Sequence, residues 1–140
     1  MKKIILFLII CIFQSKISNA KISTNNSNEM ISWCKLWMKQ DNGQRLSEIE
    51  MVKALGCSWY FKGMFDSSLF LNALNLVREG RTNSSNMQLR LNGTCVPNSI
   101  TAGQWLRIFV KYLDENPQHL NRSVTINSSA ALRKYYKCKR

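Results

Sequence analysis

The chain has 140 residues, with 20 Lys and Arg against 8 Asp and Glu, and its formal net charge at pH 7 is +12. This length suffices for one domain with a hydrophobic core, and the charge indicates either an anionic partner or a solvated basic surface. An acidic protein, a membrane surface or a cell-wall polymer would fit the charge. Nucleic acid is not expected, because the sequence contains no recognisable recognition motif.

The first 20 residues have the pattern of a secretory signal peptide. Two lysines precede a continuous apolar run over residues 4–13, and Ala20 stands where a signal peptidase reads the chain. The run is about ten residues long, roughly half of what a membrane-spanning helix needs. No second long apolar run follows. We therefore expect cleavage after Ala20, export from the cytoplasm, and no membrane-embedded segment in the mature chain.

Cleavage would remove three lysines and no acids, which lowers the net charge from +12 to +9. It would also remove Cys11 and leave an even number of cysteines: Cys34, Cys57, Cys95 and Cys138. An even number in a small exported domain predicts two disulfides. No two of these cysteines form a C-x-x-C pair and the chain has one histidine, so a zinc site is not expected.

The mature chain begins with a polar segment, residues 21–28, which we predict to be disordered. A first helix is predicted over residues 29–40, and the turn residues 41–43 end it. Its apolar stripe consists of Met30, Trp33, Cys34 and Trp37.

A long helix is predicted over residues 47–77, begun by a capping box of Ser47 and Glu50. One side of it carries Val52, Gly56, Tyr60, Gly63, Ser67, Phe70, Leu74 and Val77. We interpret the Gly and Ser residues on this side as room for another helix to pack closely on Tyr60, since they are poor helix formers.

Residues 80–94 are predicted to be a long polar connection, of a length that is often functional or mobile. A second capping box, Thr101 with Gln104, begins a helix over residues 102–115 that has the wide apolar stripe of a core helix. After the stop at Asn116-Pro117, Ser123 caps a last helix to about Tyr136, weakened by the polar residues 127–129. No segment shows sustained strand alternation. The expected fold is all-α, a compact bundle of about four helices.

This helical order brings particular cysteines together. In an antiparallel helical hairpin, residues equally far from the turn face each other, so Cys95 before the third helix faces Cys138 after the fourth. The same argument pairs Cys34 with Cys57 across the turn at residues 41–46. Four cysteines permit three connectivities, of which we predict Cys34–Cys57 and Cys95–Cys138.

The sequence offers no catalytic constellation. His119, the single histidine, lies in a polar loop, and the cysteines that it could activate are assigned to disulfides. The acidic residues are scattered, and the adjacent Asp114 and Glu115 point in different directions on a helix. A phosphate-binding glycine loop, a nucleophile elbow and an HExxH motif are all missing from the sequence. We therefore expect neither an enzyme nor a cofactor.

Three sequence blocks follow one another over residues 50–138. They are Cys57, Tyr60 and Gly63; then Cys95, Pro97, Thr101, Gln104, Tyr112, Leu113, Asn116 and Pro117; then Ala131, Leu132, Tyr136 and Cys138. In this order and spacing they resemble the Rap/Tai family of periplasmic immunity proteins, which neutralise peptidoglycan amidase effectors of bacterial type VI secretion. The chain departs from the family pattern at Lys137 and Tyr136, where Pro and Phe are usual, and Cys34 is additional.

The resemblance implies a non-catalytic, disulfide-bonded helical domain that is often a homodimer and acts by binding. Its implied mechanism is occlusion, in which part of the immunity protein covers or enters the active-site cleft of the amidase. The motif residues are then mostly structural: Tyr60, Gly63, Pro97, Gln104, Tyr112 and Pro117.

We place the effector-binding surface on polar loops that the motifs do not include. The first choice is the loop over residues 115–123, with Asn116, Gln118, His119 and Arg122 as polar contacts. The second choice is the connection over residues 80–94, with Arg81 and Arg90, because Arg is favoured at interface hot spots.

Two alternatives stay open. A general envelope protein, such as an acid-stress chaperone or a wall-associated cationic protein, could use a similar scaffold, and a chaperone should expose extensive apolar surface. A eukaryotic secreted helical factor is supported only by N-x-S/T triplets at Asn25, Asn83, Asn92, Asn121 and Asn127.

Overall fold

The computed structural model describes residues 26–80, 89–91 and 94–138. The predicted signal peptide and its cleavage site lie outside them. The elements are α2 (Ser27–Asp41), α3 (Glu48–Arg78), β1 (Leu89–Leu91), β2 (Thr94–Val96), α4 (Ala102–Glu115), the 3₁₀ turn η1 (Pro117–His119) and α5 (Val124–Tyr135). None of the helices in the described part of the chain is long and apolar enough to span a membrane.

Side-chain caps begin α3, α4 and α5 where the sequence predicts them. The Ser47 hydroxyl accepts from the Glu50 amide, and the Glu50 carboxylate accepts from the Ser47 amide. Thr101 and Gln104 make the same reciprocal pair at the start of α4, and Ser123 caps α5. Each cap satisfies amides that the first helical turn leaves without partners.

Helix α2 begins earlier than predicted. The Asn26 side chain accepts a hydrogen bond from the backbone amide of Asn28 and caps the helix. Residues 27 and 28 are therefore helical, and their prediction as disordered was wrong. The reason is a distant contact, since the buried Ser27 binds the backbone of Arg122.

The prediction that residues 80–94 form only a polar connection was also wrong in its last part. β1 and β2 pair antiparallel, with Arg90 opposite Cys95. Leu91 and Val96 of this hairpin are fully buried. Strands of three residues are too short to show the alternation by which a sequence predicts them. The fold remains all-α in class, with four helices and this small hairpin among the described residues.

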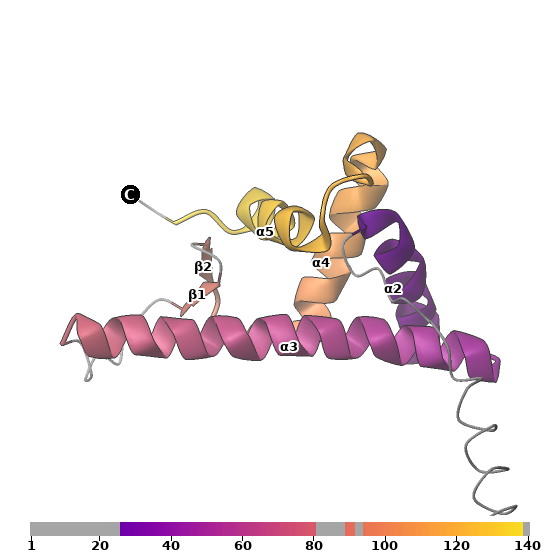
Figure 1. Cartoon of the computed structure of the whole chain (residues 1–140), viewed down its shortest axis with the longest axis horizontal. Helices are drawn as coiled ribbons and strands as arrows, with labels where there is room; N and C mark the ends of the chain where they lie inside the picture. The colour runs from indigo at the N-terminus through magenta and orange to yellow at the C-terminus, as the bar shows by residue number, and fades with distance from the viewer. Residues whose placement is uncertain (1–25, 81–88, 92–93, 139–140) are drawn as a thin grey trace, which may run out of the picture.

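The long helix α3 is the base on which the other elements lie (Figure 1). Helices α2 and α4 and strand β1 contact α3, while α5 packs on α4 and also contacts β2 and α2. The loop that joins α4 to α5 lies at the end of α4 far from α3 (Figure 1). This arrangement raises the loop above the rest of the molecule.

Helix α4 supplies the centre of the core, as its wide apolar stripe predicts. Its buried residues are Trp105, Leu106, Phe109, Val110, Tyr112 and Leu113. Phe61 of α3 meets this stripe, with its ring centroid 6.1 Å from that of Trp105 in an edge-to-face arrangement and 5.1 Å from that of Phe109. Such aromatic pairs stabilise the packing beyond the area that they bury.

The side of α3 on which we expected another helix to pack is mostly exposed, and only Gly56 and Tyr60 on it are covered by other parts of the chain. The buried residues of α3 are instead Ala54, Cys57, Phe61 and Ser68. At Gly63, no described atom lies within 4 Å of where a Cβ would stand, so the packing role predicted for this glycine was wrong within the chain. At Gly56 a Cβ would lie 3.0 Å from the Trp33 ring, so a close approach exists there, to α2.

Both predicted disulfides are present. Cys34–Cys57 joins α2 to α3 and is fully buried. Cys95–Cys138 joins β2 to the segment that follows α5. Each bond therefore connects two elements that already pack against each other or against a common neighbour.

Candidate functional site

The loop at residues 116–123 is a compact turn closed by its own backbone. The amide of His119 donates to the carbonyl of Asn116 at 3.0 Å, and the amide of Arg122 donates to the carbonyl of His119 at 2.9 Å. The Asn116 side chain donates back to the carbonyl of Tyr112 at 2.8 Å, which ties the loop to the end of α4. The loop is thus an ordered extension of α4.

Buried groups hold this loop from beneath. The Tyr112 hydroxyl lies 2.7 Å from Nδ1 of His119. The amide nitrogen of Asn127, on α5, donates to the His119 carbonyl at 2.8 Å and to the Ser27 hydroxyl at 2.9 Å. Asn127 and Ser27 are both fully buried. A buried amide nitrogen with two acceptors is not available to a glycan. Asn127 therefore has a structural role, and its triplet is not a glycan site.

The structure brings the first predicted contact group together on this loop. Gln118 and Arg122 are exposed, while Asn116 and His119 are half-buried. The second group is elsewhere: Arg90 is exposed on β1, which contacts α3, and Arg81 lies outside the described residues. The loop is at the far end of the 14-residue helix α4, roughly 20 Å from the start of that helix at 1.5 Å per residue.

The remaining motif residues lie where they shape turns and packing. Gln104 completes the cap of α4, and Pro97 accepts from the Ile100 amide in the turn before it. Pro117 begins η1, where a missing amide proton costs nothing. Tyr60 is half-buried and packs against the edge of the core.

A charged cluster borders the loop at the end of α4. The Glu115 carboxylate binds Lys134 at 2.5 Å and the Tyr135 hydroxyl at 3.3 Å. The hydrogen bond from Lys134, helped by its charge, holds the pKa of Glu115 below 4.5. The same bond raises the pKa of Lys134 above 10.5. Both side chains are well exposed, so this pair contributes charge to the surface more than stability.

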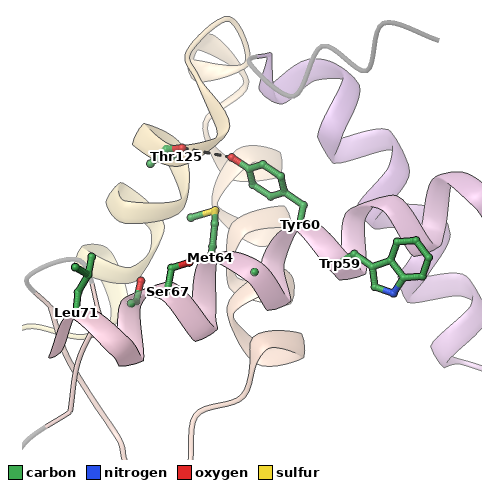
Figure 2. Close-up of a pocket in the computed structure, with 8 residues that line it drawn as sticks. Trp59, Tyr60, Met64, Ser67, Leu71 and Thr125 are labelled. Carbon is green, nitrogen blue, oxygen red and sulfur yellow. Dashed lines mark hydrogen bonds between the residues drawn. The ribbon is translucent and has the colours of Figure 1, made fainter. Parts of the chain in front are cut away.

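A shallow groove of about 460 Å³ lies between α3 and α5. Its lining residues are Trp59, Tyr60, Gly63, Met64, Ser67, Ser68, Leu71 and Thr125. Figure 2 shows Tyr60 reaching from α3 to Thr125 on α5, at 3.3 Å between their oxygens, while Trp59 projects away from Thr125. The groove is mainly apolar and has no group suited to chemistry.

Next to this groove, α3 exposes a row of large apolar side chains along its length. Their exposed fractions lie between 43% and 72%, and we call them the α3 stripe: Ile49, Val52, Trp59, Phe70, Leu74 and Val77. The small residues Gly56, Gly63 and Ser67 stand between them. Several exposed apolar side chains on one face of a helix are typical of an interaction site.

The side chains that we considered for catalysis or metal binding are engaged in other contacts in the described part of the chain. The four cysteines there are disulfide-bonded. No group of three His, Cys, Asp or Glu side chains among the described residues could hold a metal ion. His119 is engaged with Tyr112.

Comparison with known proteins gives this scaffold a family. A family model described as Rap1a immunity proteins matches residues 26–138, from the cap of α2 to the cysteine after α5. Searches of curated proteins and of solved structures returned no match. Because the family model covers most of the chain, the protein belongs to the Rap1a immunity proteins.

Proposed function

We propose that this protein is a periplasmic immunity protein that binds and blocks a peptidoglycan amidase effector delivered by type VI secretion. The family match over residues 26–138 carries the proposal. The two disulfides fit an oxidising compartment, and the signal-peptide pattern of residues 1–20 supports export to it. A periplasmic immunity protein would stand between an arriving amidase and the cell wall.

The mechanism we propose is occlusion of the amidase active site by the loop at residues 116–123. This loop lies at the far end of α4 from α3, where it can reach into a cleft (Figure 1). It presents the exposed side chains of Gln118 and Arg122 on a backbone that is already ordered. An ordered loop loses little conformational entropy on binding, which favours affinity. The positive net charge of the chain would speed association with an acidic effector surface.

The test uses the amidase encoded beside this gene. The mature protein should co-purify with it at about one protomer per amidase and abolish its hydrolysis of peptidoglycan. A catalytically inactive amidase should bind equally well, since occlusion does not need turnover. Full hydrolysis at a saturating concentration of this protein would reject occlusion, and a gene neighbourhood without an effector would count against immunity.

The α3 stripe gives some support to a chaperone-like envelope protein, because chaperones expose apolar surface. The stripe is confined to one face of one helix, however, and its large residues are interrupted by Gly56, Gly63 and Ser67, which suits a single partner of fixed shape. Suppression of the acid-induced aggregation of unrelated proteins would favour the chaperone alternative.

We propose that the partner on the α3 stripe is a second copy of this chain. The stripe is centred on Gly63: Ile49 and Val77 each stand 14 residues from it, and Val52 and Leu74 each stand 11 residues from it. Trp59 stands 4 residues before Gly63 and Phe70 stands 7 residues after it. In an antiparallel pair of α3 helices centred on Gly63, residues equally far from it face each other. The facing pairs are Trp59 with Ser67, Gly56 with Phe70, Val52 with Leu74 and Ile49 with Val77.

These pairs are complementary in size as well as in spacing. Trp59 faces the small Ser67, and Gly63 faces itself, where its open Cβ position lets the helices approach. Gly56 lies under the Trp33 ring of its own chain, so Phe70 of the second copy would pack against that ring. Trp59 of the second copy would lie over Ser67, at the groove that Tyr60 helps to line. A two-fold dimer of this kind needs one self-complementary patch, which the α3 stripe provides.

The register can be tested with a single cysteine. Gly63→Cys places two thiols at the two-fold axis, so mild oxidation of the purified protein should give a covalent dimer on a non-reducing gel. Lys62→Cys is the matched control, because its neighbouring position is exposed but off the stripe, and it should stay monomeric on the gel. Equal cross-linking of both variants, or cross-linking of neither, would contradict this register.

A further inference from the structure

We infer that Asn127 is a positioning residue for the effector-binding loop, holding residues 119–122 in the conformation that meets the effector. The inference rests on the proposed function for its role in binding. Its structural part concerns the free protein and can be tested without an effector.

Asn127 connects three segments that are far apart in the sequence. Its amide nitrogen donates at 2.8 Å to the His119 carbonyl in the loop and at 2.9 Å to the Ser27 hydroxyl at the start of α2. Ser27 in turn donates to the Arg122 carbonyl, from its hydroxyl at 2.9 Å and from its amide at 3.2 Å. Two carbonyls of the loop, those of His119 and Arg122, are therefore held by donors from outside it.

The hydrogen bonds from Asn127 and Ser27 hold the buried side of the loop, and we call this pair of residues the clamp. Asn127 and Ser27 are fully buried, so their hydrogen bonds do not compete with water. On the opposite side of the same loop, Gln118 and Arg122 extend exposed side chains. Tyr112 fixes the His119 ring from α4 at 2.7 Å. The loop is thus held by α2 and α5 through its backbone and by α4 through the His119 ring, while the side chains of Gln118 and Arg122 remain available to a partner.

Asn127 has no other evident task that would explain a buried amide. Its Oδ1 atom has no hydrogen-bond partner among the described residues, which makes the residue costly to bury. The neighbouring Ser128 provides a comparison, since it is equally buried and its hydroxyl also has no partner among them. Ser128 contacts α4 through its carbonyl, which accepts from the Trp105 ring nitrogen, and not through its hydroxyl.

Hydrogen exchange of the free protein tests the clamp. In Asn127→Ala the amides of Leu120 and Arg122, which donate within the loop, should exchange about tenfold faster, a change of about 1.4 kcal/mol in local opening. The amides of α4 around Phe109 should change less than about twofold. Ser128→Ala, the matched control, should leave both regions unchanged.

The same variants then test the role in binding. Asn127→Ala should weaken binding of the neighbouring amidase about tenfold, mainly through slower association, because the loop must order before it docks. Ser27→Ala keeps one donor to Arg122 and should give a smaller effect in the same direction, and it replaces Asn127→Ala if that variant fails to fold.

Loop exchange that is unaltered in both variants would overturn the clamp. Faster exchange with unchanged amidase affinity would overturn the role in binding. Absence of binding by the unmodified protein would instead reject the proposed function.

Discussion

At the scale of single residues, Glu50 is the clearest case of a side chain that links charge to folding. Its carboxylate accepts from the Ser47 amide and from the Ser47 hydroxyl at the start of α3. These hydrogen bonds hold the pKa of Glu50 below 4.5. A carboxyl group whose pKa is lower in the folded state stabilises the fold above the unfolded pKa, and this stabilisation is lost as the pH falls through the folded pKa.

We therefore predict that Glu50→Gln flattens the acid side of the stability profile. Gln can still cap the helix but does not titrate, so Tm should fall less between about pH 6 and about pH 3 than in the unmodified protein. Glu29→Gln is the control, since this acid in the first turn of α2 has no capping box. Identical acid profiles for Glu50→Gln and the unmodified protein would show that this cap does not contribute.

Residues also show which contacts the sequence could predict. The capping boxes of α3 and α4 were predictable because each joins positions three residues apart, a spacing visible in the sequence. The contacts of Asn127 were not predictable, because its partners Ser27 and His119 are distant in the chain. In the sequence, Asn127 is one of the polar residues that make the last predicted helix less regular, and it begins an N-x-S/T triplet. In the fold it is buried inside an unbroken α5.

At the scale of elements, α3 is the helix whose faces were misassigned. It carries apolar residues on two sides, and a regular spacing does not indicate which side turns to the core. The core side is decided by the Cys34–Cys57 bond and by the packing of Phe61 on α4. The regularly spaced side became the exposed α3 stripe. The short hairpin was missed for a different reason, because three residues carry no measurable period.

Two glycines on α3 give opposite predictions for the same substitution. Gly56→Ala puts a methyl group 3.0 Å from the Trp33 ring, so its overpacking cost of about 1–3 kcal/mol should outweigh a gain in helix propensity of about 0.5–1 kcal/mol and destabilise the fold. Gly63→Ala meets no described atom and should stabilise α3 by about 0.5–1 kcal/mol through helix propensity. Urea unfolding at low protein concentration measures both. A stabilising Gly56→Ala would contradict the packing of α2 on α3 described above.

At the scale of the whole molecule, two disulfides connect the ends of the chain to its middle. Cys34–Cys57 spans 23 residues and Cys95–Cys138 spans 43. Their pairing was predictable because a helical order with short turns brings one set of positions together. The membership of the Rap1a immunity proteins was likewise predictable, since the ordered motif blocks extend over most of the chain. The binding surfaces could not be predicted in the same way, because the motifs identify residues that pack inside the fold and do not include the loops.

Removal of the second disulfide should weaken the fold without abolishing it. Cys95→Ser with Cys138→Ser should lower the free energy of unfolding by about 2–4 kcal/mol, because the unfolded chain regains the freedom of a long loop. Cys138 is exposed and Cys95 half-buried, so the serines themselves cost little. Urea unfolding of the double variant under oxidising conditions, with the disulfide-bonded unmodified protein as the reference, measures this loss. Unchanged stability would mean that the packing of α5 on α4 alone holds the C-terminal segment.

The central claim, that the loop at residues 116–123 occludes an amidase, is tested most directly by comparing two surfaces in one inhibition assay. Gln118→Glu with Arg122→Glu changes the exposed face of the loop, while Arg90→Glu changes the hairpin on the other side of α4. The account predicts that the loop variant loses inhibition of the neighbouring amidase by at least about a hundredfold, roughly 2.7 kcal/mol, with an unchanged Tm. Arg90→Glu should inhibit as the unmodified protein does. Full inhibition by the loop variant, or loss of inhibition only in Arg90→Glu, would contradict the account.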